Sequence, residues 1–232
     1  MHSEYFHNND TEEITRYVQR LVETDELALR AHCQEVSRQT DTSYLALRKR
    51  CADKVGEVHT VLKAMAEGLR SLSQALSQSA GVFRTQDGQA DFPTVCSAVT
   101  RIEEERRQLL WGILALSEVR EELAVGVAQL NRILHFLSIA KRAVPRDVQP
   151  YYTKETKCVE VIYERTTKMD AALLEVQTAS MTMVESHLRS FMKKLRSVTD
   201  FNHAGKELDR AEIRSLCGEL LILLERIPNV SF

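Results

Sequence analysis

The apolar residues of this chain recur with the period of a helix that packs against another helix. Between residues 51 and 76, apolar positions follow one another in alternating steps of four and three residues. They are Cys51, Val55, Val58, Leu62, Met65, Leu69, Leu72 and Leu76. A stripe of this kind is typical of a coiled-coil seam, in which the apolar edge of one helix is covered by its neighbour.

Helical periodicity covers most of the chain and stops at a few segments that contain Gly or Pro. We expect a flexible tail at residues 1–9 and a first helix from about residue 10 to 83. Its polar stretch 38–43 has two interpretations: Asp41 or Thr42 caps a new helix after a break or bend, or one helix continues through it. Further helices are predicted at about 93–143, 151–199 and 206–227, with turns at 81–93, 144–150 and 199–205.

These elements predict an all-α fold that forms one domain over residues 10–228. Because the connections are short, successive long helices should run in opposite directions. We therefore expect an elongated antiparallel bundle of three long helices plus a short C-terminal helix, with coiled-coil-like packing. The second helix should be central, with Trp111 in the core or at an interface edge, and Gly112 and Gly126 should let a neighbouring backbone approach closely.

Composition supports few, long elements and argues against several classes of protein. Gly (8) and Pro (4) are scarce among 232 residues, so the many turns of a sheet protein are not expected. The 31 basic and 33 acidic residues nearly balance, so no nucleic-acid partner is expected. No secretory signal or membrane-spanning stretch is evident, and five widely spaced cysteines are typical of reduced thiols. We expect a cytoplasmic protein.

The sequence contains no pattern typical of catalysis or of a metal site. It has no Gly-rich phosphate loop, no GxSxG and no HExxH. No histidine lies three or four residues from another histidine or from a cysteine, the spacing at which two ligands share one helix face. We therefore expect a protein that is not an enzyme and that has no cofactor and no metal.

Binding is the function class that remains, and two surfaces are candidates for it. The final helix is apolar on nearly all sides, which favours a protein-binding surface at Leu216, Leu220, Leu223 and Leu224. The first hypothesis is a coiled-coil scaffold or adaptor that binds protein partners and itself as a homo-oligomer. The alternative is a peripheral membrane-binding or membrane-shaping helical dimer that uses Arg189, Lys193, Lys194 and Arg196 as a basic patch for anionic headgroups.

Overall fold

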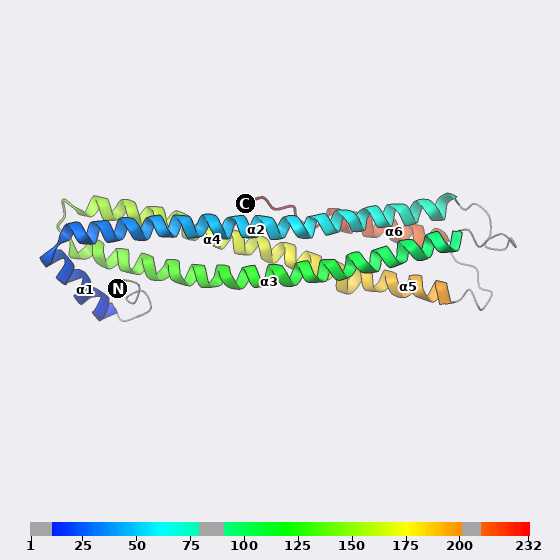
Figure 1. The fold of residues 1–232 in the computed structure, drawn as a ribbon, viewed down its shortest axis with the longest axis horizontal. Coiled ribbons are helices and arrows are strands. Elements are labelled where there is room, and N and C mark those ends of the chain that lie inside the picture. The colour runs from blue at the N-terminus through cyan, green and yellow to red at the C-terminus, as the bar shows by residue number, and fades with distance from the viewer. Residues whose placement is uncertain (1–10, 79–90, 201–209) are drawn as a thin grey trace. The chain divides into compact units, whose positions relative to one another are not determined.

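The computed structural model describes residues 11–78, 91–200 and 210–232, and it is helical without strands over these residues (Figure 1). The long helices α2, α3 and α4 pack against one another, which confirms the predicted all-α class. The elements are α1 (Thr11–Thr24), α2 (Glu26–Gln78), α3 (Asp91–Ala143), α4 (Gln149–Thr182), a π-helix η3 (Met183–Leu188), α5 (Arg189–Asp200) and α6 (Arg210–Glu225). The predicted tail at 1–9 and most of the turns at 81–93 and 199–205 lie outside the described residues.

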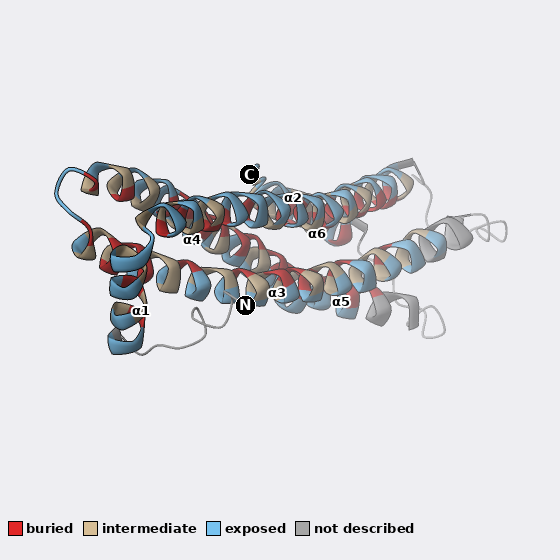
Figure 2. Ribbon diagram, turned by 60° about the vertical axis from the view of Figure 1, so that its left-hand side comes forward, coloured by how far each residue is buried: buried red, intermediate tan, exposed pale blue. Residues whose placement is uncertain are grey.

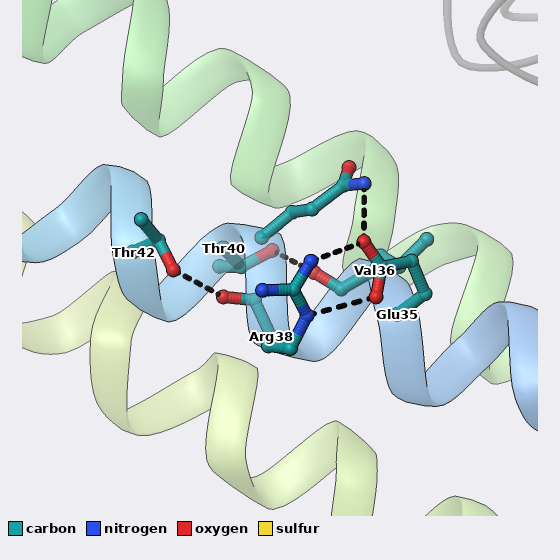
Figure 3. Close-up of polar contacts among 6 residues, drawn as sticks. Glu35, Val36, Arg38, Thr40 and Thr42 are labelled. Carbon is teal, nitrogen blue, oxygen red and sulfur yellow. Dashed lines mark hydrogen bonds and ion pairs between the residues drawn. The ribbon is translucent and has the colours of Figure 1, made fainter.

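The first predicted helix is interrupted at Asp25 rather than at residues 38–43. The carboxylate of Asp25 accepts a hydrogen bond of 3.0 Å from the backbone N–H of Ala28, which is the geometry of a helix cap. Residues 38–43 are helical, and the hydroxyls of Thr40 and Thr42 donate to the carbonyls four residues back (Figure 3). Threonines that bond backwards in this way do not cap a new helix, so the continuous interpretation of this stretch holds.

The chain divides into two compact units, and α2, α3 and α4 each contribute residues to both. Unit 1 comprises residues 1–51, 118–172 and Phe232. In unit 1 the ion pair of Arg50 with Glu122, and the contact of the His32 and Phe136 rings at 5.7 Å, join α2 to α3. Residue numbers rise along one helix as they fall along the other, so α2 and α3 run in opposite directions within this unit.

Two adjacent tyrosines lie at the start of α4 in unit 1, and one of them joins α4 to α2. Tyr152 is 0% exposed, and its ring meets that of Tyr151 edge to face at 5.4 Å. The Tyr151 hydroxyl donates to the carbonyl oxygen of Arg30 in α2 at 3.2 Å. Tyr151 therefore links the start of α4 to α2, and Tyr152 is buried beside it.

Unit 2 comprises residues 52–117 and 173–231. Here Gly112 of α3 faces Val58 of α2, and Gly68 of α2 faces Ile102 of α3, so these helices are again antiparallel. A Cβ built on Gly112 would lie 2.9 Å from Val58 Cγ2 and 3.9 Å from Val58 Cα. The expected close approach of a neighbouring backbone is therefore confirmed at Gly112.

The predicted seam of residues 51–76 forms the buried face of α2. All eight of its apolar residues are at most 5% exposed. Figure 2 shows buried positions alternating with exposed ones along each helix, as an amphipathic pattern requires. The sequence pattern thus identifies correctly which side of α2 meets other helices.

The third predicted long helix contains a π-helical stretch, η3, that was not predicted from the sequence. Val176, Ser180, Val184 and Leu188 are all 0% exposed and are spaced four residues apart. In an α-helix, positions four apart drift by about 40° around the axis per step, because each residue turns about 100°. The wider π-helical turn takes up an extra residue and so keeps these side chains on one face.

By length and composition alone, the Ser97–Ala143 stretch of α3 is apolar enough to cross a membrane. Apolar core helices of soluble proteins pass the same test, and a single such helix is weak evidence for membrane insertion. Within unit 1 this helix carries an ion pair between Arg120 and Asp170 of α4, at 2.9 Å. Such a pair is expected at a helix–helix contact and is costly against lipid.

Candidate functional site

The most conspicuous exposed apolar surface in unit 2 lies on α3. Trp111 is 72% exposed and Leu114, three residues further on, is 53% exposed. Residues three apart on a helix lie on the same face, so these two side chains form one surface, here called the α3 patch. Leu109, Ile113 and Leu116 are at most 1% exposed and form the packed face of the same helix. The α3 patch is therefore additional to the apolar surface that the fold of the chain buries.

Trp111 was expected either in the core or at the edge of an interface, and the structure places it outside the core. An indole that is 72% exposed loses the stabilisation of burial. Tryptophan is enriched at the centres of protein interfaces because it brings a large apolar area with few rotatable bonds. Trp111 thus has the chemistry of an interface residue.

The leucines of the predicted partner-binding surface in α6 lie mostly against the chain itself. Leu220 and Leu224 are 4% and 7% exposed, while Leu216 and Leu223 are half-buried. Helix α6 contacts η3, and Lys194 of α5 forms an ion pair of 3.0 Å with Glu212 of α6. Ile222, at 54% exposed, is the large apolar side chain that α6 offers to solvent. The four leucines therefore do not form a common exposed surface.

The backbone beyond α6 is held to α2 within unit 2. The His59 ring lies 2.9 Å from the carbonyl oxygen of Pro228 through its Nε2 atom, which donates in the tautomer that carries a proton there. Together with the burial of Ile227, this contact fixes the end of α6 against its own unit. One face of α6, with Ile213, Cys217 and Leu220, is buried in the same unit.

Two of the four residues of the predicted basic patch have acidic partners. Arg189 pairs with Glu185 at 3.1 Å, and Lys194 pairs with Glu212. Lys193 is exposed, and the side chain of Arg196 lies outside the described residues. Exposed pairs of this kind contribute little to stability. Each acidic partner nevertheless opposes the attraction of its cation for an anionic surface.

Three thiols are buried and share a raised pKa. Burial raises the pKa of Cys33 to about 12, with the nearby Glu155 carboxylate adding to the effect. Burial likewise raises the pKa of Cys51 and of Cys217 to about 11. A thiol held in its protonated form is a poor nucleophile and a poor metal ligand. These cysteines therefore act as small core residues, whereas Cys158 is exposed.

Among residues 11–78, 91–200 and 210–232, no group of three or more His, Cys, Asp and Glu side chains is arranged to hold a metal ion. The chain shows no match to protein-family models, to curated proteins or to solved structures.

The sequence contains a signal for the α3 patch. Trp111 and Leu114 fall between the seam positions Leu109, Ile113 and Leu116 rather than on them. Apolar residues beside the seam favour contacts with more than one neighbouring helix, in this chain or in another copy. The structure packs α3 against α2 and α4 and still leaves the α3 patch in solvent.

Proposed function

We propose that this chain is a non-enzymatic helical scaffold that associates with a second copy of itself through the α3 patch and binds protein partners. The observation that supports this most directly is the 72% exposure of Trp111 beside the 53% exposure of Leu114. A patch on one helix face is matched most simply by the same patch on another copy, which gives a symmetric interface. The proposal includes an elongated antiparallel coiled-coil-like bundle as the framework that presents this face.

A cytoplasmic location is part of the same proposal. Cys33, Cys51, Cys158 and Cys217 are all free thiols, which suits a reducing compartment. The membrane-binding alternative has weaker support, because Arg189 and Lys194 already have acidic partners.

Trp111 is the only tryptophan of the chain, so its fluorescence reports on the α3 patch directly. We expect the emission of the wild-type protein to shift to shorter wavelengths as concentration rises, in step with the mass measured by sedimentation equilibrium. Leu114→Lys should raise the dimer dissociation constant at least tenfold, since a symmetric interface loses two buried leucines at roughly 1.5–3 kcal/mol each. Leu27→Lys is the matched control, because Leu27 is 75% exposed on α2 in unit 1.

Several outcomes would contradict the proposal. A monomer at all concentrations would remove the self-association, and so would an equal effect of Leu27→Lys. Emission at short wavelength in the most dilute monomer would mean that the chain itself covers Trp111. Sedimentation with anionic vesicles that is abolished by Lys193→Glu with Lys194→Glu would favour the membrane-binding alternative instead.

A further inference from the structure

A groove in unit 1 is independent of the α3 patch and has the features of a binding site for a small molecule. It encloses about 270 Å³ and is lined by residues of α2, α3 and α4. An apolar cavity of about 150 Å³ is already large enough to accept benzene. The groove therefore has room for a larger ligand.

The groove exists because small residues of three helices meet at one level of unit 1. Thr40 of α2, Gly126 of α3 and Thr166 of α4 all line it. Larger side chains at these positions would fill the space, as leucine and valine do along the rest of the packed face. Gly126 has no side chain to occupy the groove that it lines, and a Cβ built there would already lie 3.3 Å from Leu47 Cδ1.

The floor of the groove is suited to an apolar chain. Val36, Leu130 and Ile162 are buried there. The two threonine hydroxyls on the floor already donate to backbone carbonyls of their own helices: Thr40 to Val36 at 2.7 Å (Figure 3), and Thr166 to Ile162 at 2.8 Å. Since the donors are satisfied, an apolar ligand can cover them without leaving a buried N–H or O–H unpaired.

The rim of the groove carries one cation and no carboxylate. Gln39, Ser43 and Gln129 are exposed and polar, and Arg132 is the ionisable residue with a fixed charge among the lining side chains. Arg132 takes part in another interaction within the chain. A guanidinium has five N–H donors, so it can accommodate a carboxylate as well.

From this arrangement we infer that the groove binds a small amphiphile, a monocarboxylic acid with an aliphatic chain. The chain lies on the floor between α2 and α3, and the carboxylate meets Arg132 at the rim. The groove is larger than the cavity of about 150 Å³ that accepts benzene, so an aliphatic chain has room in it, and octanoate serves as the probe. This site goes beyond the proposed scaffold function and does not depend on it.

The test is calorimetric titration of the full chain with octanoate, octan-1-ol and octylammonium, each below the concentration at which it forms micelles. We expect saturable binding of one octanoate per chain and at least tenfold weaker binding of octylammonium. Arg132→Gln should weaken octanoate at least tenfold and leave octan-1-ol unchanged. Gly126→Leu should weaken both by at least tenfold, because its side chain occupies the groove.

Gly56→Leu is the matched control, since a Cβ built on Gly56 meets nothing within 4 Å. It should bind octanoate as the wild type does. Circular dichroism shows whether Gly126→Leu is folded, and the comparison of octanoate with octylammonium needs no variant at all. Failure of octanoate to saturate, equal affinity for octylammonium, or full affinity in folded Gly126→Leu would overturn the inference.

Discussion

Two glycines in helices of unit 2 differ in what their missing side chains allow. Gly112 permits α3 to lie against Val58 of α2, where a Cβ would come within 2.9 Å of Cγ2. The side chain of a helical valine has one strongly preferred rotamer and cannot move away easily. Gly56 faces open space instead.

We predict that Gly112→Ala is less stable than Gly56→Ala by about 1–3 kcal/mol, the usual cost of overpacking. Both variants gain the same helix propensity, about 1 kcal/mol, so the difference isolates the contact with Val58. Urea unfolding followed by circular dichroism measures both. Equal stabilities would mean that α2 and α3 do not approach at Gly112.

A buried hydroxyl in α4 lacks a partner. Ser180 is 0% exposed and its Oγ makes no hydrogen bond, whereas Thr166, equally deep in α4, donates to a carbonyl. We predict that Ser180→Ala raises the free energy of unfolding by about 1 kcal/mol, because it removes an unsatisfied polar group. Thr166→Val should lower it by a similar amount. A loss of stability in Ser180→Ala would indicate a hydrogen bond of Ser180 in solution.

One carboxyl should give the stability a specific dependence on pH. Arg38 donates twice to Glu35, at 2.7 and 2.8 Å, and Gln39 donates once at 2.7 Å (Figure 3). These bonds hold the pKa of the Glu35 carboxyl at about 2. In the unfolded chain the pKa returns to about 4.3, so the folded state releases the proton more readily.

The stabilisation by Glu35 is therefore complete above about pH 5 and is lost as pH falls toward 2. We predict that the difference in unfolding free energy between wild type and Glu35→Gln is constant at neutral pH and shrinks across this range. The side chains are solvent-exposed, so added salt should reduce the difference. An unchanged difference at pH 3 would contradict the prediction.

At the scale of elements, the sequence predicted well where apolar spacing was regular. The seam at 51–76 was identified completely because alternating steps of four and three match an α-helix. The break at Asp25 was missed because Asp41 and Thr42 have equal capping chemistry, and only the fold decides which polar residue meets a free N–H. The groove could not be predicted, since it depends on three small residues of three helices meeting at one level.

The π-helix η3 leads to a prediction about a deletion. Removing exposed Ser186 shortens the last four-residue step to three, so a regular α-helix can keep Val176, Ser180, Val184 and Leu188 on one face. We expect this variant to fold and to unfold cooperatively.

Removing exposed Glu160 from regular α4 turns all later seam residues by about 100°. This deletion should lower the free energy of unfolding by more than about 3 kcal/mol, since several buried side chains are displaced. Thermal melts compare the Ser186 and Glu160 deletion variants. Equal melting temperatures would argue that η3 does not take up an extra residue.

At the scale of the whole molecule, the two units share continuous helices. Helix α2 passes from unit 1 to unit 2 between Cys51 and Ala52, and α3 passes between Ser117 and Glu118. No loop separates the units at these two points, so the unfolding of one unit should remove packing partners along the same helices in the other. We therefore expect a single cooperative transition.

The buried thiols provide the measurement. Cys33 and Cys51 belong to unit 1 and Cys217 to unit 2, and all three are 0% exposed. In a background with Cys96→Ser and Cys158→Ser, an aromatic disulfide reagent at pH 8 should modify each thiol only through unfolding, because burial raises their pKa values and blocks access. When refolding outpaces modification, the rate of labelling reports the free energy of opening. The three thiols should therefore react with the same opening free energy, and this value should match global unfolding in urea. If Cys217 reacted through a smaller opening than Cys33, α6 would be a separately unfolding element and the two units would not share one transition.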